Sequence, residues 1–464
     1  MSQIAADGMH RGLKARHVEL IALGGIIGSC YFLGTGQVIS QVGPAAFLAY
    51  ILGGVIVYLT MLCMGELAVA IPISGSFVTY AADYISPIVA CGAGWSYWLN
   101  WVIYIPAECV AAGIIMETLT GVNGYVWAVC FGLLITAINL CRVSLFGEIE
   151  FWLAIVKIFA LIGFTILSLF IFFGMIRGAQ STEWIGAHYL YRDSGLMPHG
   201  ALSLLTAMVL MLVNYQGSEI VGIAAGESEH PEKSIPKAVR RVCFRILCLY
   251  ILPVFCLVLI FPWQKANLSN SVFADALNFY GLKWAGTVIA FVTLAAALSS
   301  ANSGYYGAVR ALRGLALHHM APQFLIKLNR HHSPHNAIFM TLFGIWAVLF
   351  LGYFFGEYNF YIALLLVSGF TGTACWIVLC WAQIRFRKQW LKQGKTLQEL
   401  KYKTPGSPYT GIVAIVLMLF ALFMLAFDDD TTYRVAFVIG VSCIVIPMMI
   451  YSVVCKQRQK KRYI

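Results

Sequence analysis

The sequence predicts an all-α polytopic membrane protein with twelve membrane-spanning helices. Of its 464 residues, 60% are hydrophobic and only 11% are charged, and the mean hydropathy is +0.80. A soluble protein has about 25% charged residues, so composition excludes a soluble class. One helical span of a bilayer takes about 20 mainly apolar residues, and such segments follow one another along nearly the whole chain.

Twelve apolar segments are long enough to span a membrane. They cover about residues 18–40, 45–70, 87–116, 124–142, 150–175, 200–227, 242–263, 284–314, 336–356, 360–384, 409–427 and 433–454. The third and eighth are the longest, which predicts tilted helices. We expect one membrane domain over residues 1–464, with five-helix halves at 1–176 and 200–390 and two further helices at 408–455.

Lysine and arginine are strongly biased to one side of the predicted membrane. With the N-terminus inside, 25 of the 31 lie in inner connections and tails, five lie in outer connections, and Lys157 lies in a span. Cytoplasmic loops carry such an excess, so both termini are predicted to be cytoplasmic. The basic residues are spread over six segments on this side, so the net charge of +11 indicates membrane orientation and not a nucleic-acid partner.

Motifs for catalysis, metal binding and disulfide formation are missing from the sequence. The thirteen cysteines include no C-x-x-C pair and lie mostly in apolar segments, which is neither a zinc pattern nor a disulfide framework. There is also no H-E-x-x-H and no G-x-S-x-G motif. We therefore expect no enzyme activity, no metal and no cofactor apart from a coupling proton.

Two predicted spans are interrupted at corresponding positions of the two halves. Five glycines lie between Leu23 and Gly36, and each weakens a helix by about 1 kcal/mol relative to alanine. A second glycine-rich stretch, residues 214–227, lies in the sixth span. Glycine also permits close packing of membrane helices, but paired breaks indicate a transport site. Since each half has five spans, the two copies must be inverted.

Facing helix breaks suit a zwitterionic substrate. Half-helix N-termini present unpaired N–H groups that attract a carboxylate, whereas C-termini present carbonyl oxygens that attract an ammonium group. The candidate substrate-binding residues are Ile26, Gly28, Ser29 and Cys30 in the first break and Asn214, Tyr215, Gly217 and Ser218 in the second.

Three ionisable residues lie deep in spans and are functional candidates, because intramembrane charge is unfavourable. Lys157 either exchanges a proton or forms a static structural pair. Glu108 either lines the substrate cavity or bonds a neighbouring helix. Glu219 follows the second break, where it either caps the next half-helix or takes part in gating and proton transfer.

Four other glutamates lie near inner helix ends: Glu66, Glu148, Glu150 and Glu227. They can pair with basic residues of the inner loops. For each taken alone, we expect a solvated charge at a helix end.

The chain resembles the amino acid–polyamine–organocation transporters, in the bacterial branch that holds lysine, aromatic amino acid, GABA and S-methylmethionine permeases. The matching motifs are Arg16-His17, Gly24-Gly25-Ile26-Ile27-Gly28-Ser29, Gly65-Glu66-Leu67-Ala68 with Pro72 and Ser74-Gly75, Tyr97-Trp98, Glu148-Ile149-Glu150-Phe151-Trp152 with Lys157, residues 217–228, residues 298–304, and Tyr402 with Pro405 and Pro408. The first break departs from the family, which usually has Gly-Thr-Gly where this chain has Gly28-Ser29-Cys30.

The resemblance implies a LeuT-type fold of 5+5 inverted repeats with broken helices 1 and 6. It implies proton-coupled uptake, with Lys157 at the place where sodium-coupled relatives bind an ion between spans one, five and eight. Ser299 and Ser303 are the nearest candidates for that neighbourhood. Glu108 matches an acidic position that branches of the family with quite different substrates share, so it does not by itself establish a cationic substrate. A cationic or amine-bearing substrate is the expectation.

We therefore expect an integral protein of the bacterial inner membrane that imports an amino acid by proton symport and alternating access. An exchanger, a channel and a substrate-sensing receptor are the alternatives. A channel would not require Lys157, and a receptor would normally carry a cytoplasmic signalling extension. The expected partners are the amino acid and membrane lipid.

Overall fold

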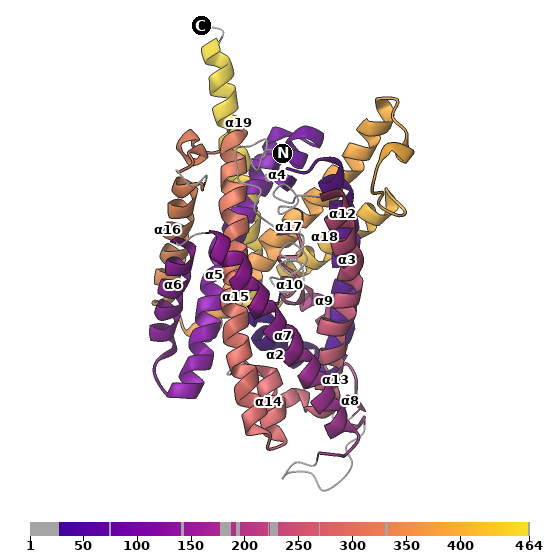
Figure 1. The fold of residues 1–464 in the computed structure, drawn as a ribbon, viewed down its shortest axis with the longest axis vertical. Coiled ribbons are helices and arrows are strands. Elements are labelled where there is room, and N and C mark those ends of the chain that lie inside the picture. Colours follow the sequence, from indigo (N-terminus) through magenta and orange to yellow (C-terminus); the bar gives the residue numbers. More distant parts are fainter. Residues whose placement is uncertain are drawn as a thin grey trace.

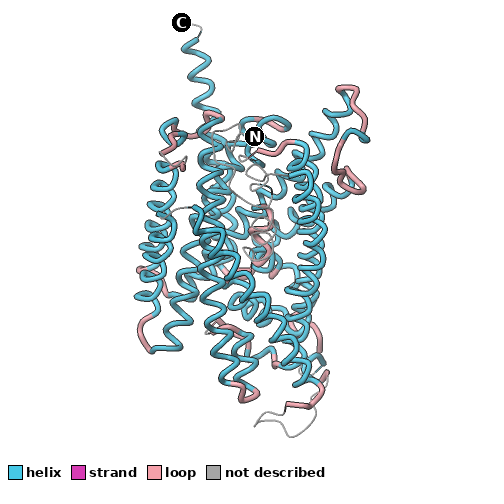
Figure 2. Tube along the Cα trace, viewed as in Figure 1, coloured by secondary structure: helices cyan, strands magenta, loops and turns pink. Residues whose placement is uncertain are grey.

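The computed structural model describes residues 27–73, 76–140, 143–176, 187–191, 195–220, 222, 231–268, 270–329 and 333–462. Over these residues the chain forms helices and connecting loops without a β-strand (Figure 2). Nine helices of the described part are long and apolar enough to cross a membrane: Cys30–Ala70, Pro87–Thr120, Trp152–Phe172, Glu232–Ile260, Lys283–Leu317, His335–Gly352, Asn359–Lys392, Tyr409–Phe427 and Thr431–Cys455. The all-α membrane class is confirmed.

The first of these segments contains a sharp turn. The π-helix η1 (Cys30–Gly34) continues into α2 (Thr35–Val42), and the 3-10 helix η2 (Gly43–Ala45) leads into α3 (Ala46–Ala70). Gly43 has φ +80°, in the left-handed region that favours glycine. A Cβ there would also overlap the ring of Pro198. The turn falls between the first two predicted spans.

The long helix α5 (Pro87–Thr120) lies at the centre of the helix packing. It packs against α15 (Lys283–Leu317), α17 (Glu357–Lys392), α6 (Gly124–Leu140) and α19 (Thr431–Arg462). Its N-terminus has a side-chain cap and a proline in the first turn, and its C-terminus has a left-handed glycine, which are ordinary helix boundary signals. Gly304 of α15 lies directly against the indole ring of Trp101, so these two helices approach closely.

The remaining described helices are α4 (Ser76–Tyr84), α7 (Val143–Phe172), α8 (His188–Tyr191), α9 (Gly200–Thr206), α10 (Met208–Val213), α12 (Pro231–Arg245), η3 (Ile246–Ile251), α13 (Leu252–Ile260), η4 (Trp263–Lys265), α14 (Val272–Phe279), η5 (Gln323–Ile326), α16 (His335–Gly352), η6 (Leu397–Glu399), α18 (Tyr409–Met424) and η7 (Leu425–Phe427). Figure 1 shows α6 and α16 on one side of the bundle and α3 and α12 on the other, with α10 inside it. Figure 1 shows α8 and α14 at one end of the bundle and the α17–α18 connection at the other.

An ion pair between Arg387 of α17 and the buried Glu66 joins α17 to α3, and Thr404 of the α17–α18 connection also contacts it. Arg387 donates from Nε to Glu66 Oε1 at 3.0 Å and from Nη2 to Glu66 Oε2. The backbone N–H of Thr404 donates to the same carboxylate at 2.5 Å, and its hydroxyl donates to the Leu62 carbonyl at 3.0 Å. The expectation that Glu66 is a solvated end charge is therefore wrong. Its side chain is fully buried, because the connection covers this end of α3.

The substitution Arg387→Met should lower the free energy of unfolding by about 3 kcal/mol, because it leaves the buried Glu66 carboxylate without its cation. Chemical unfolding of the detergent-solubilised protein measures this change. Arg385→Met is the matched control, since Arg385 is exposed and bonds only a carbonyl oxygen among the interactions described. We expect it to change stability by less than about 0.5 kcal/mol. Equal stability of the two variants would contradict the structural role of the pair.

Candidate functional site

At the first break, one backbone carbonyl group binds a lysine side chain and one backbone N–H group binds a glutamate side chain. Ile27 and Gly28 are not helical, and the helix begins at Ser29. The carbonyl oxygen of Ile27 accepts a hydrogen bond of 3.0 Å from Lys157 Nζ. The N–H of Ser29 donates to Glu108 Oε2 at 3.0 Å. A helix start with free N–H groups stabilises a carboxylate, and Glu108 uses one of them.

Two adjacent serines of α15 complete this arrangement. Ser299 Oγ accepts a hydrogen bond of 2.7 Å from Lys157 Nζ and donates to a carboxylate oxygen of Glu150. Ser300 Oγ donates to Glu108 Oε1 at 2.6 Å. The site thus joins α5, α7, α15 and the first break through buried polar side chains.

Gly28 is required by the close approach of these groups. A Cβ at this position would overlap Glu108 Oε1 and would lie within 3 Å of Tyr104 Oη and Ser300 Oγ. Heavy atoms do not approach a Cβ this closely, so any side chain would displace the Glu108 carboxyl group. Here the glycine serves the approach of side chains to backbone.

The burial of Glu150 corrects a second expectation from the sequence. Glu150 is fully buried and is bonded to Ser299, so it is not a solvated charge at a helix end. It precedes Lys157 by seven residues, or about two helical turns, which places both side chains on the same face of α7. That face packs against α15. The side chains of Glu148 and Glu227 lie outside the described residues.

The second break is a series of turns tied to neighbouring helices by Glu219. Residues 214–219 form turns after α10, and Gly217 has φ +94°. The Glu219 carboxylate accepts hydrogen bonds from the Gly217 N–H at 3.1 Å, Tyr97 Oη at 3.2 Å and Trp376 Nε1 at 3.1 Å. Figure 2 shows loop backbone inside the bundle, where Figure 1 places α10. Glu219 therefore holds this loop against α5 and α17.

The other second-break candidates contact α3 and the end of α12. Asn214 Nδ2 donates to Tyr50 Oη at 2.5 Å, and Tyr215 Oη donates to the Tyr50 carbonyl at 2.9 Å. Ser218 Oγ donates to the Tyr215 carbonyl at 2.8 Å and accepts from Arg245 Nη2 at 3.2 Å. Asn214, Tyr215 and Ser218 are all buried.

A tyrosine cluster connects the two breaks. The ring of Tyr215 lies 4.6 Å from that of Tyr250, which in turn lies 4.8 Å from Tyr31, as measured between ring centroids. Tyr31 Oη donates to the Tyr250 carbonyl at 3.0 Å. Since Tyr31 follows the first break directly, the two interrupted segments share one packed surface.

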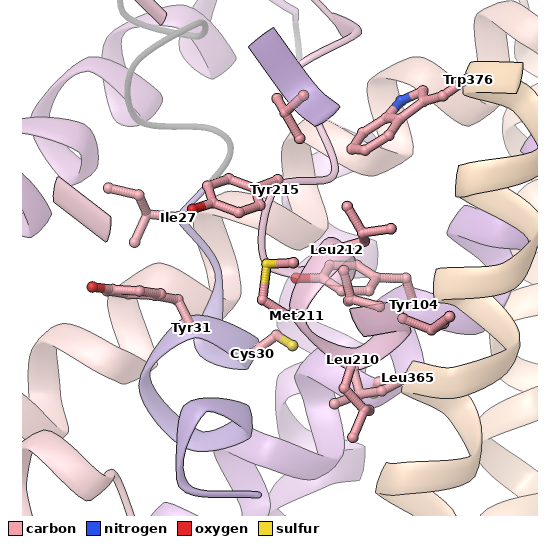
Figure 3. Close-up of a cluster of buried hydrophobic side chains, with 14 of the residues drawn as sticks. Ile27, Cys30, Tyr31, Tyr104, Leu210, Met211, Leu212, Tyr215, Leu365 and Trp376 are labelled. Atoms are coloured by element: carbon pink, nitrogen blue, oxygen red, sulfur yellow. The ribbon is translucent and has the colours of Figure 1, made fainter. Parts of the chain in front are cut away.

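Cys30 lies in the first turn after the break and is buried. Figure 3 shows its side chain directed toward α10 and Tyr104, on the opposite side from the ring of Tyr31. A Cβ added at Gly34 would lie 3.1 Å from the Cys30 sulfur, so the thiol also rests on the next helical turn. The sulfur therefore occupies space between the first break and its neighbours.

The structure brings the predicted site residues into two groups, and α5 contacts both. Gly28, Ser29, Glu108, Lys157 and Ser299 form the first group, and Asn214, Tyr215, Gly217, Ser218 and Glu219 form the second. Ser303 is buried one helical turn from Ser299. Ile26 lies outside the described residues. Among the residues that are described, no cluster of His, Cys, Asp or Glu is suited to a metal ion.

Sequence reasoning overlooked Arg245 as a buried cation. The count of basic residues given above places Arg245 with an inner connection, although it falls within the predicted seventh span at 242–263. The structure buries it beside Ser218. Lys157 is therefore not the only cation deep in the bundle, and the position of Arg245 within an apolar segment was the available signal.

The chain is similar to bacterial permeases over nearly its full length. Residues 17–462 match the amino acid permease family. Amino-acid permease RocC of Bacillus subtilis is 37% identical, covering 97% of this chain and 96% of its own. Lysine-specific permease LysP of Escherichia coli is 37% identical, with coverages of 89% and 86%. L-asparagine permease of Escherichia coli is 33% identical, with coverages of 93% and 86%.

Solved structures establish the fold class. A manganese transporter of Eremococcus coleocola has a TM-score of 0.57 at 14% identity and covers 96% of this chain and 94% of its own. Together with the interrupted helices, this similarity defines an integral membrane protein with the fold of transporters. More particularly, the chain belongs to the amino acid permease family, within the amino acid–polyamine–organocation superfamily. Family membership supports amino acid transport and not enzyme activity.

The substitution Cys30→Gly should alter substrate selection, because it empties space beside the first break. We expect the relative inhibition by at least two competing amino acids to change about 10-fold, which corresponds to about 1.4 kcal/mol. Competition against radiolabelled uptake measures the ranking. Cys91→Gly is the matched control. It also removes a buried thiol, but this thiol lies near Met320, at the N-terminal end of α5 and away from the first break. An unchanged ranking in the Cys30 variant would refute the assigned role.

Proposed function

We propose that the chain imports an amino acid across the bacterial inner membrane by proton symport and alternating access. The proposal includes twelve spans, inverted halves at residues 1–176 and 200–390, two further helices at 408–455 and cytoplasmic termini. Its main support is the pair of hydrogen bonds from Lys157 Nζ to the Ile27 carbonyl and to Ser299 Oγ. They join the first break to α15 through one titratable group.

Coupling follows from the dependence of these bonds on the charge of Lys157. An ammonium group holds the two acceptors with charge-assisted bonds, which are about twice as strong as neutral ones. Loss of the proton weakens the attachment of the first break to α15. A proton can then shift the balance between two arrangements of these elements, because it binds them with different affinity.

We also propose a cationic or amine-bearing amino acid as the substrate. The buried Glu108 carboxylate lies at the start of the half-helix, bonded to the N–H of Ser29. A carboxylate at this position can pair with a positively charged side chain. Relatives at similar identity include a lysine permease and a putative histidine permease, and also an asparagine permease.

Proteoliposomes that contain the purified protein test the coupling. We expect the wild type to accumulate substrate only with an inward proton gradient or an inside-negative potential. Lys157→Ala should abolish accumulation and leave substrate binding measurable by thermal shift. Lys265→Ala is the matched control, since this lysine is exposed outside the site and contacts the ring of Phe279. Wild-type accumulation by the Lys157 variant, or accumulation without any gradient, would exclude proton symport through this residue.

A thermal-shift screen of the twenty amino acids and common amines tests the substrate class. We expect the largest stabilisation from cationic compounds. Glu108→Gln should weaken their binding about 30-fold, or about 2 kcal/mol, as expected for loss of one charged hydrogen bond. Binding of neutral amino acids should change less. If a neutral or acidic amino acid stabilises the wild type most, the substrate proposal is wrong.

A further inference from the structure

We propose that Glu150 is the inner proton acceptor of a relay that starts at Lys157, which rests on the proton symport proposed above. The Ser299 hydroxyl lies between the two residues. It accepts from Lys157 Nζ at 2.7 Å and donates to Glu150 Oε1. A hydroxyl that accepts one hydrogen bond while donating another can pass a proton from the first partner to the second.

The Glu150 carboxyl group is buried and incompletely bonded. Its Oε2 atom is buried and accepts no well-formed hydrogen bond among the described residues, and the hydroxyl of Ser303, which acts on the same carboxyl group, also lacks one. A buried polar atom without a partner is unfavourable, and such atoms in native proteins require an explanation. A carboxylate that serves only as a structural counter-ion would be stabilised further by a well-formed bond from this second hydroxyl. An oxygen without such a bond fits a group that receives and releases a proton.

The relay runs from the first break toward the inner side. Lys157 also donates to the Ile27 carbonyl, so one end of the relay contacts the break. Glu150 lies seven residues nearer the start of α7, about 10 Å along the helix axis. That start adjoins Arg142, which the distribution of basic residues assigns to an inner connection. The order of groups therefore matches inward proton movement.

The transfer is balanced within these three residues. The N–H bond of the Lys157 ammonium breaks as a proton moves to Ser299 Oγ, and the Ser299 O–H proton moves to Glu150 Oε1. An ammonium and a carboxylate become a neutral amine and a neutral acid, and Ser299 is unchanged. Glu150 is buried in this conformation, and it releases its proton to water when the inner side opens in the proposed alternating access. Glu108, the other charged group that acts on Lys157, is bonded separately to Ser29 and Ser300.

Neutralisation also weakens the contact that Lys157 makes with the break. The neutral amine retains two N–H donors but loses the charge that strengthens its bonds to Ile27 and Ser299. Movement of a proton to Glu150 therefore loosens the first break from α15 at the same step. A static counter-ion would not link these two events.

Glu150→Gln separates the relay from a static role. The amide oxygen can still accept the Ser299 hydrogen bond, but the side chain cannot take up a proton. We expect net accumulation and substrate-driven proton entry, followed with an internal pH dye, to fall about 100-fold, as for loss of a proton-transfer group. Exchange of labelled for unlabelled substrate at equal pH should persist, because it needs no net proton release. Glu150→Asp should recover part of the proton entry.

Glu117→Gln is the matched control. Glu117 lies in the last turn of α5, at the end opposite the predicted inner side. Among the contacts described, its carbonyl group accepts the N–H of Gly121 and its side chain has no bond. It should behave as wild type.

Two results would overturn the relay. One is proton entry at the wild-type rate in Glu150→Gln. The other is an equal loss of exchange and of net uptake in Glu150→Gln while its thermal stability is normal. If Glu150→Gln does not fold, Ser299→Ala must show the same selective loss of proton entry. Absence of substrate-driven proton entry in the wild type would instead refute the proposed symport itself.

Discussion

The hydrogen bonds of Lys157 hold the first break in place, and the rest of the site depends on them. An interrupted helix inside an apolar bundle exposes backbone groups that no water can satisfy. The Ile27 carbonyl is satisfied by a side-chain ammonium, and the Ser29 N–H is satisfied by a side-chain carboxylate. Helices α7 and α5 therefore supply the hydrogen-bond partners of these two backbone groups.

Helix α5 gives both breaks a common support. Its Glu108 binds the first break, and its Tyr97, three turns earlier, binds Glu219 of the second. The tyrosine cluster adds a second connection between the breaks. The two interrupted segments are thus joined by a continuous series of packed and hydrogen-bonded groups.

The sequence predicted the breaks and the deep charges, because each has a local signal. Glycines within an apolar segment mark the breaks, and Lys157 and Glu108 stand out among hydrophobic neighbours. The environments of Glu66 and Glu150 were not predictable in this way. Glu66 is buried by partners more than 300 residues away, and Glu150 is bonded by Ser299 of another helix. Proximity to a helix end does not reveal whether another segment covers that end.

Two adjacent serines of α15 are hydrogen-bonded to Glu108 of α5 and to Lys157 of α7, so both charged side chains contact the same helix. Ser300 fixes Glu108, while Ser299 fixes Lys157. A displacement of α15 relative to the first break would lengthen both sets of bonds together. In the function proposed above, substrate binding at Glu108 and a change of charge at Lys157 would act on the same displacement, which is the physical condition for linking two binding events.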